Sequence, residues 1–241
     1  MIGYMKLLLI SNSTNAGEDY LAHALGTIGK FLGKEKINAL FIPYAAVTFS
    51  YDEYERKVQK RFLETGHEIY SIHHADNPRH AIRDAEAIVV GGGNTWHLLT
   101  LLQNEDLLGN IAERVMEGMP YIGWSAGSNL ACPTIKTTND MPIIQPKSFE
   151  ALGLIPFQIN PHYLDSNPEG HAGETREMRI REFLKVNPGI YVAGLREGTM
   201  LWAEGKKMRL LGPKNLRLFR EGMKPVELSP KDSLDFLLVT P

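Results

Sequence analysis

The chain has 241 residues, of which 43% are hydrophobic and 22% are charged, and its formal net charge is −2. This composition suits one globular α/β domain over residues 1–241, and the absence of a basic stripe argues against a nucleic-acid-binding protein. Cys132 is the only cysteine, so the chain can form no internal disulfide. The apolar run at residues 5–10 is too short to cross a membrane, and we expect a cytoplasmic protein.

Strand and helix patterns alternate over the first half of the chain. An apolar run predicts a buried strand at residues 6–10, and a stripe of residues spaced by threes and fours predicts the first helix, namely Leu21, Leu25, Ile28 and Leu32. Further strands are predicted at residues 37–45, 67–74, 86–93 and 120–124, with helices at 51–66, 78–85 and 95–117. This alternation is typical of a mostly parallel sheet with helices on both faces, whose sites form beyond the carboxyl ends of the strands.

The pattern is less regular after residue 133. Residues 157–163 resemble a strand, and residues 173–189 have the composition and spacing of a helix. Three later runs, at residues 190–198, 200–212 and 216–222, are typical of short strands, and we expect them to form an antiparallel edge.

Ser125 lies between glycines in the segment Gly123-Trp124-Ser125-Ala126-Gly127, directly after a predicted strand. A strand, a sharp turn and a helix can hold a serine exposed at the top of a sheet, and the crowded turn requires small neighbours. The amide of Ala126 would then open the helix and point at a developing oxyanion. The alternative is an ordinary turn serine that caps a helix.

Three glycines follow the strand at 86–93, in the segment "VVGGGNT". They permit close approach of the backbone to a ligand, and the amide of Gly93 is a candidate second oxyanion donor. The spacing does not match the dinucleotide-binding fingerprint. Asn94 is a candidate substrate-binding residue, although Asn94 or Thr95 can equally cap the next helix.

A nucleophilic serine needs a base and a group that orients the base. Among eight histidines, His162 is the best placed, because it follows a strand-like run and the rigid Pro161. The orienting carboxylate can be Asp140 or Glu197, and the pattern does not choose between them. His73 and His74 lie in a polar connection and look solvated.

With no H-E-x-x-H motif and no cysteine cluster, the sequence predicts no metal site.

Two further residues are candidates for substrate contact. His171 lies in a glycine-rich loop, and Arg176 falls on the apolar stripe of the predicted helix at 173–189. An arginine on an inward face needs an anionic partner or a route to solvent. It can serve a structural salt bridge, or it can bind a substrate carboxylate with its guanidinium group.

Several of these segments together resemble the peptidase E family, the α-aspartyl dipeptidases of peptidase family S51. The matching segments span about residues 5–220 and include "LLLISNST", "FIPYAAVT", "IVVGGGNT", "YIGWSAGSNLACPTIKTTNDMPI", "QINPHY", "PEGHAGETREMRIRE" and "GLREG". The resemblance implies a glutamine-amidotransferase-like α/β fold. It also implies a cytosolic serine peptidase that hydrolyses dipeptides with an N-terminal aspartate, without a metal or organic cofactor.

By position, the resemblance implies that Ser125 is the nucleophile and His162 the general base, with either Glu197 or Asp140 as third member. It also implies that Gly93 and Ala126 supply the oxyanion amides, and it places His171 and Arg176 near the aspartyl carboxylate. The chain departs from the family pattern at Ser128, Tyr163 and Arg196.

Three other interpretations remain open. The first is a hydrolase of the same fold that acts on other aspartyl or isoaspartyl peptides, and the second is a non-catalytic ligand-binding relative. The third is an amidotransferase-like enzyme that uses the thiol of Cys132, although this residue lies seven positions beyond Ser125. We expect small peptides as partners, neither nucleic acid nor membrane, and a monomer or homodimer.

Overall fold

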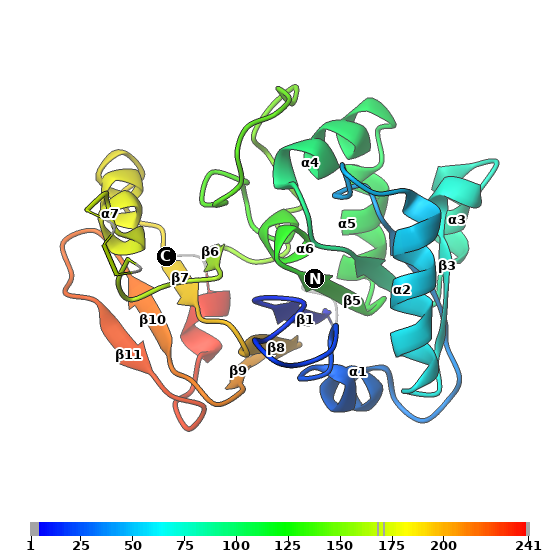
Figure 1. Cartoon of the computed structure of the whole chain (residues 1–241), viewed down its shortest axis with the longest axis horizontal. Coiled ribbons are helices and arrows are strands. Elements are labelled where there is room, and N and C mark those ends of the chain that lie inside the picture. The colour runs from blue at the N-terminus through cyan, green and yellow to red at the C-terminus, as the bar shows by residue number, and fades with distance from the viewer. Residues whose placement is uncertain (1–4, 168, 171, 240–241) are drawn as a thin grey trace.

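The computed structural model describes residues 5–167, 169–170 and 172–239, and its strands form two sheets. The strands are β1 (Lys6–Ile10), β2 (Asn38–Ile42), β3 (Glu68–Ser71), β4 (Ile88–Val90), β5 (Tyr121–Trp124), β6 (Gln158–Pro161), β7 (Val192–Leu195), β8 (Met200–Glu204), β9 (Lys207–Leu211), β10 (Leu216–Phe219) and β11 (Val226–Leu228). The larger sheet has the order β3-β2-β4-β5-β1-β8-β9, and the smaller one has the order β11-β10-β7-β6. The two sheets lie side by side (Figure 1).

The α-helices are α1 (Leu25–Leu32), α2 (Tyr51–Leu63), α3 (Pro78–Asp84), α4 (Thr95–Asn104), α5 (Leu108–Met116), α6 (Ala126–Leu130) and α7 (Arg176–Val186). Two short 3-10 helices, η1 (Ile72–His74) and η2 (Asp235–Leu238), complete the described elements. Helix α2 begins at a capping box, in which Ser50 Oγ accepts a hydrogen bond from the Glu53 amide and the Glu53 carboxylate accepts one from the Ser50 amide.

Helices cover both faces of the larger sheet because its central strands carry apolar side chains on both faces. In β1, Leu8 and Ile10 pack into the cluster that contains the apolar residues of α1 and α2. Leu7 and Leu9 point to the opposite face and pack with residues of α3, α4, α5 and α6. All four leucine and isoleucine side chains are fully buried. The continuous apolar run at residues 6–10 therefore has the composition that a central strand requires, since successive side chains alternate between faces.

The predicted fold class is confirmed. Strands β1 to β5 pair in parallel, and β8 and β9 add an antiparallel edge beside β1. The smaller sheet was not predicted. Strand β6 pairs in parallel with β7, and β10 and β11 continue that sheet antiparallel, so the C-terminal strands divide between two sheets.

Three predicted elements differ from the structure. The helix expected at 95–117 is two helices, because Asp106 between them has φ +53°, which helical geometry does not allow. Leu21 has φ +57° and lies before α1 rather than within it. The strand expected at 67–74 ends at Ser71, where the chain turns into η1. None of the helices in the described ranges is long and apolar enough to cross a membrane.

Candidate active site

Ser125 lies in a sharp turn between the end of β5 and the start of α6. Its backbone has φ 51° and ψ −109°, a conformation rarely adopted by a residue with a side chain. A Cβ on Gly123 would lie 2.5 Å from the Gly127 carbonyl oxygen, and one on Gly127 would lie 2.3 Å from the Val90 carbonyl oxygen. The close approach of three backbone segments therefore explains the glycines that flank Ser125.

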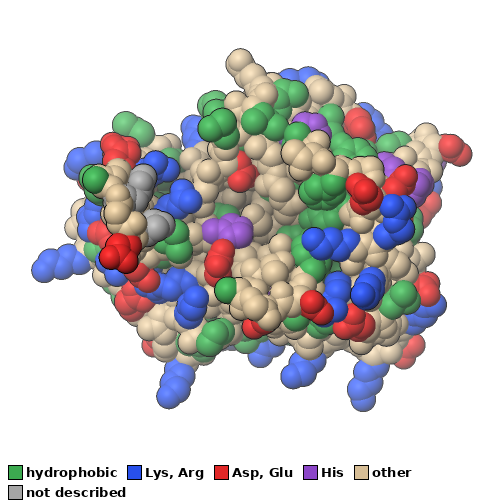
Figure 2. All heavy atoms as spheres, viewed as in Figure 1, with side chains coloured by type: hydrophobic (Ala, Val, Ile, Leu, Met, Phe, Trp, Pro, Cys, Tyr) green, Lys and Arg blue, Asp and Glu red, His purple; other side chains and the backbone are tan. Residues whose placement is uncertain are grey.

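His162 and Glu197 lie beyond the carboxyl ends of two neighbouring parallel strands of the smaller sheet. Pro161 at the end of β6 is opposite Leu195 at the end of β7, so the residues that follow emerge side by side. His162 Nε2 is 3.0 Å from Ser125 Oγ, and His162 Nδ1 is 2.8 Å from Glu197 Oε1. The three side chains form a continuous hydrogen-bonded chain. Histidine and acidic side chains are visible in the hollow at the centre of Figure 2.

The hydrogen bonds define which nitrogen of His162 carries the proton. An ionised carboxylate can only accept, so the contact with Glu197 requires a proton on Nδ1. In the neutral ring, Nε2 then presents a lone pair to the hydroxyl of Ser125. This arrangement permits proton transfer from Ser125 to His162.

Asp140, the other carboxylate considered from the sequence, has a different position. Its Oδ2 accepts hydrogen bonds from the Thr95 amide at 2.8 Å, from Thr95 Oγ1 at 2.5 Å and from Thr138 Oγ1 at 3.1 Å. It therefore binds the first turn of α4, where a carboxylate is favourable. The hydrogen bond to His162 comes from Glu197 and not from Asp140.

The buried hydroxyl of Ser11 connects the end of β1 to the segments that carry His162 and Glu197. Ser11 Oγ donates to the Leu195 carbonyl oxygen at 2.7 Å and accepts from the His162 amide at 3.0 Å. The Ser11 amide also donates to the Thr199 carbonyl oxygen. Ser11 is fully buried. The sequence placed the loop after the first strand at the site, but nothing in the pattern singled out Ser11.

Two backbone loops approach Ser125 closely enough to supply hydrogen-bond donors. A Cβ on Gly92 would lie 3.1 Å from Ser125 Cβ, and one on Gly93 would lie 2.2 Å from the Ala45 carbonyl oxygen. Ala126 is the first residue of α6. Within the described residues, the amides of Gly93 and Ala126 donate to no protein acceptor. Both amides can therefore donate to a ligand.

Arg176 lines a pocket of about 200 Å³ beside Asp140 and Asn160. Burial lowers the pKa of Arg176, the neighbouring Arg179 lowers it further, and Asp140 acts in the opposite direction. Arg176 makes no ion pair or hydrogen bond with any residue in the described part of the chain. An unpaired guanidinium in a pocket can receive an anionic group of a ligand.

Three other residues singled out in the sequence have different outcomes. The side chain of Asn94 caps α4 by accepting from the His97 amide, and its nitrogen donates to the Met141 carbonyl oxygen, so both of its polar ends are engaged. His171 lies outside the described residues. Cys132 is fully buried, and burial raises the pKa of its thiol to about 12. A neutral buried thiol is a poor nucleophile, which argues against the amidotransferase-like interpretation.

Arg196 does not compete with His162 for Glu197. Its guanidinium binds the carboxylates of Asp165 and Glu227 and donates to the Asn215 carbonyl oxygen. Hydrogen bonds to Asp165 and Glu227 raise the pKa of Arg196. Arg196, where the chain departs from the family pattern, therefore joins β11 of the smaller sheet to the loop after β6. Its guanidinium does not bind Glu197, whose carboxylate contacts His162.

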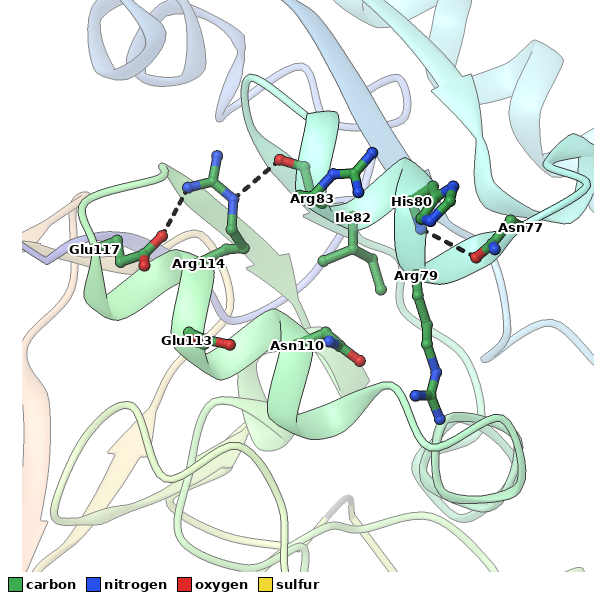
Figure 3. Close-up of a pocket in the computed structure, with 9 residues that line it drawn as sticks. All are labelled: Asn77, Arg79, His80, Ile82, Arg83, Asn110, Glu113, Arg114 and Glu117. Carbon is green, nitrogen blue, oxygen red and sulfur yellow. Dashed lines mark hydrogen bonds and ion pairs between the residues drawn. The ribbon is translucent and has the colours of Figure 1, made fainter.

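A larger surface pocket of about 630 Å³ lies between α3 and α5 and contains none of these groups (Figure 3). It carries three arginines, but each is already paired with a carboxylate, in the pairs Arg79–Asp106, Arg83–Asp84 and Arg114–Glu117. The three arginines of this pocket are therefore engaged in ion pairs, and the pocket contains none of the residues that surround Ser125.

Comparison with known proteins gives an independent result. Peptidase family S51 matches the chain over residues 7–211. The chain is 54% identical over 233 residues to a peptidase E of Nostoc sp., covering 97% of this chain and 96% of that protein. It is 49% identical over 224 residues to a peptidase E of Salmonella arizonae, covering 93% of this chain and 97% of that protein.

Two solved structures share the fold at low sequence identity. A putative peptidase E protein from Listeria monocytogenes superposes with a TM-score of 0.65 at 21% identity, covering 88% of this chain and all of that one. A peptidase from an acI-B1 actinobacterium superposes with a TM-score of 0.71 at 20% identity, covering 97% of both chains.

The backbone of Ser125 generates a prediction about stability. Both Ser125→Gly and Ser125→Ala remove the hydroxyl, but only glycine relieves the positive φ, so the glycine variant should have a free energy of unfolding about 1–2 kcal/mol higher than the alanine variant. Urea unfolding measures the difference. At Ser233, which is not among the positive-φ residues, glycine should bring no such gain over alanine. Equal stability of the two Ser125 variants would show that the turn is unstrained.

Proposed function

This chain belongs to peptidase family S51 and is a serine dipeptidase, and from that premise we propose that it hydrolyses dipeptides with an N-terminal aspartate. The observation that carries the mechanism is the hydrogen-bonded chain from Ser125 through His162 to Glu197. The observation that supports the substrate is the unpaired guanidinium of Arg176, in a pocket that is also lined by Asn160, two residues before His162.

Hydrolysis proceeds in two acyl-transfer steps. His162 Nε2 accepts the proton of the Ser125 hydroxyl as the oxygen attacks the aspartyl carbonyl carbon. The leaving amino acid then departs with that proton from His162, which leaves an aspartyl ester on Ser125. Water then attacks the ester carbonyl carbon as His162 takes its proton, and His162 returns that proton to the Ser125 oxygen as aspartate leaves. Glu197 keeps the ring in the required tautomer and stabilises the imidazolium form.

The negative charge on the carbonyl oxygen develops between the amides of Gly93 and Ala126. Both donors belong to rigid backbone, so they need little reorganisation as the charge appears, and such preorganised donors often supply the largest share of catalysis. The positive end of α6, which begins at Ala126, adds to this stabilisation.

The side-chain carboxylate of the substrate binds Arg176. A charge-assisted hydrogen bond to a guanidinium is stronger than one to a neutral amide group, so asparagine, which has nearly the same shape, should be a poor replacement for aspartate. His171 belongs to the same predicted substrate contact. Asn94 remains a weaker candidate because its side chain already caps α4.

The proposal extends to the whole chain. Residues 1–241 act as a single α/β domain, since the hydrogen bonds of Ser11 join the end of β1 to both strands that carry the catalytic partners. The enzyme works in the cytoplasm as a monomer or homodimer on free small peptides, and its mechanism needs no cofactor. Other aspartyl or isoaspartyl peptides are the alternative substrates, because their free carboxylates present similar chemistry to Arg176.

Hydrolysis of Asp-Leu and Asn-Leu tests the proposal. Wild type should cleave Asp-Leu, and Ser125→Ala and His162→Ala should each lower kcat/KM by more than about 10³-fold. Wild type should prefer Asp-Leu to Asn-Leu by about 10–100-fold, and Arg176→Gln should remove most of that preference. Amino acid release, followed by chromatography, gives all the rates.

Arg181→Gln is the matched control, because Arg181 lies on the same helix but is exposed and pairs with Glu177. It should retain the preference for aspartate. Equal turnover of Asp-Leu and Asn-Leu by wild type would overturn the role of the guanidinium. Cleavage of β-linked but not α-linked aspartyl dipeptides would favour the alternative substrates.

A further inference from the structure

Four potential metal ligands meet where the start of α2 contacts the segment after β3. Asp52 and Glu55, one turn apart on α2, face His73 and His74 of η1. One ligand atom from each residue lies within 4.8 Å of the ligand atoms of the other three. Among the residues that the structure describes, this is the one place where three or more such side chains converge so closely. Figure 2 shows histidine and acidic side chains together over this end of α2.

The more buried half of the cluster is held in place by Ser71. The Ser71 amide donates to Glu55 Oε1 at 2.9 Å, which leaves Oε2 directed at the cluster. Ser71 Oγ lies 2.6 Å from His73 Nδ1 and 3.4 Å from the Phe41 carbonyl oxygen. The hydroxyl can therefore accept the Nδ1 proton of His73 while it donates to Phe41, and His73 Nε2 is directed at Asp52 Oδ1 in the cluster. Partners of this kind orient the ligands in metal sites.

Packing adds to this orientation. The ring centroids of His73 and His74 lie 3.9 Å apart. The Tyr51 ring contacts His73 edge to face, with 5.5 Å between the ring centroids. The side chains of His73 and Glu55 are only 17% and 20% exposed, whereas those of His74 and Asp52 are each 57% exposed. Two ligands are thus fixed by their surroundings, and the other two remain open to a metal arriving from solvent.

The spacing of the four atoms fits a small divalent cation. His73 Nε2 is 2.9 Å from Asp52 Oδ1, which is 3.5 Å from His74 Nε2, and His74 Nε2 is 2.8 Å from Glu55 Oε2. Zinc–ligand bonds of about 2.0–2.2 Å place neighbouring ligand atoms of a tetrahedron about 3.3–3.6 Å apart. To accept such an ion, the two shortest of these pairs must separate by about 0.5 Å, and because all four atoms lie within 4.8 Å of one another, no pair must approach by more than about 1.5 Å.

We propose that Asp52, Glu55, His73 and His74 form a binding site for a divalent transition-metal ion of the zinc class. Two imidazoles and two carboxylates are a donor set that suits Zn²⁺. When the ion binds, His73 Nε2 and His74 Nε2 each release to solvent the proton that they donate to Asp52 and Glu55, and the metal takes the place of both protons. The site lies apart from Ser125 and ties the start of α2 to η1.

Titration of the purified chain with Zn²⁺ in a calorimeter tests this site. Wild type should bind one ion through the cluster, and His74→Ala and Glu55→Gln should each weaken that binding by at least about 10-fold. His80→Ala is the matched control, because it removes an exposed histidine outside the cluster and should leave the affinity unchanged. Titration with Co²⁺ gives a second readout, since tetrahedral coordination produces visible absorption that the two cluster variants should lose.

The outcomes are decisive for variants that keep the wild-type circular dichroism spectrum. Millimolar or weaker binding by wild type would overturn the proposal. Binding by His74→Ala and Glu55→Gln with wild-type affinity would overturn it as well, because the ion would then occupy some other group.

A second inference concerns Tyr54, also on α2, and it rests on the proposed function. Tyr54 Oη lies 3.0 Å from the Gly92 carbonyl oxygen, to which it donates. That carbonyl belongs to the same peptide unit as the Gly93 amide. In a trans peptide the C=O and N–H groups point in opposite directions, so a hydrogen bond to the Gly92 oxygen fixes the direction of the Gly93 N–H.

The hydroxyl of Tyr54 is itself held firmly. It lies 3.1 Å from Trp124 Nε1 and 3.1 Å from the Tyr20 hydroxyl, and both can donate to it. Only 4% of Tyr54 is exposed. Because Trp124 directly precedes Ser125, this single hydroxyl connects both backbone segments that approach the bound carbonyl oxygen. A peptide between two glycines rotates easily without such an anchor.

The geometry points to Tyr54 as a positioning residue that holds the Gly92–Gly93 peptide with its amide turned toward the oxyanion. Tyr54→Phe should lower kcat for Asp-Leu by about 10–100-fold and change KM by less than about 3-fold, because the donor matters most when charge develops. Tyr51→Phe, which removes a neighbouring hydroxyl outside this network, should keep the wild-type kcat.

Circular dichroism establishes that both tyrosine variants are folded at the assay temperature. A wild-type kcat for folded Tyr54→Phe would overturn this inference while leaving the proposed function intact. A rise in KM without a fall in kcat would also overturn it, because the hydroxyl would then act on binding alone. If wild type itself fails to cleave Asp-Leu, the failure belongs to the proposed function instead.

Discussion

The buried hydroxyl of Ser11 is the interaction on which the site depends most. Ser125, the proposed nucleophile, follows a strand of the larger sheet, whereas His162 and Glu197 follow strands of the smaller one. Ser11 lies at the end of β1, beside β5 in the larger sheet, and its hydroxyl binds the backbone at both His162 and the end of β7. A buried hydroxyl with both partners satisfied resists rearrangement, because breaking either bond leaves a polar group unpaired. It thereby fixes the distance between groups that belong to different sheets.

The site also concentrates unusual backbone conformations. Ser125 and His162 both have positive φ, at 51° and 52°, and they are two of the four non-glycine residues with this feature in the described ranges. Such conformations persist only where the surroundings impose them. Here the glycines at 123 and 127 permit backbone contacts that a Cβ would prevent. The strain directs the hydroxyl and the imidazole toward each other, and the packed sheet beneath them sustains it.

Local patterns in the sequence were sufficient for the fold class and for the position of Ser125. The continuous apolar run of β1 and the glycines around Ser125 both reflect constraints that act within a few residues. The sequence could not distinguish Asp140 from Glu197 as the partner of His162. The position of Glu197 beside His162 depends on the pairing of β6 with β7, and no local pattern predicts that sheet. The break between α4 and α5 was missed for a related reason, since an aspartate with positive φ at 106 leaves the helical spacing of the flanking residues intact. Ser11, Tyr54 and the cluster of Asp52 and His73 likewise become evident only when distant segments are brought together.

Helix α2 links several of these features, although none of its residues belongs to the catalytic chain. Its first five residues include two of the four proposed metal ligands, Asp52 and Glu55, and Tyr54 lies between them in sequence and donates from its hydroxyl to the Gly92 carbonyl oxygen. The capping box at Ser50 and Glu53 fixes where the helix begins and therefore where these side chains point. A helix outside the catalytic chain thus supports the geometry within it.

The central claim is that the imidazole of His162 activates the hydroxyl of Ser125, and covalent labelling with a fluorophosphonate measures this activation directly. The account predicts one label per wild-type chain, located by mass spectrometry on the peptide that contains Ser125, and labelling of His162→Ala at least about 10³-fold slower. Labelling of His162→Ala at the wild-type rate, or no reaction of the wild type at Ser125, would contradict it.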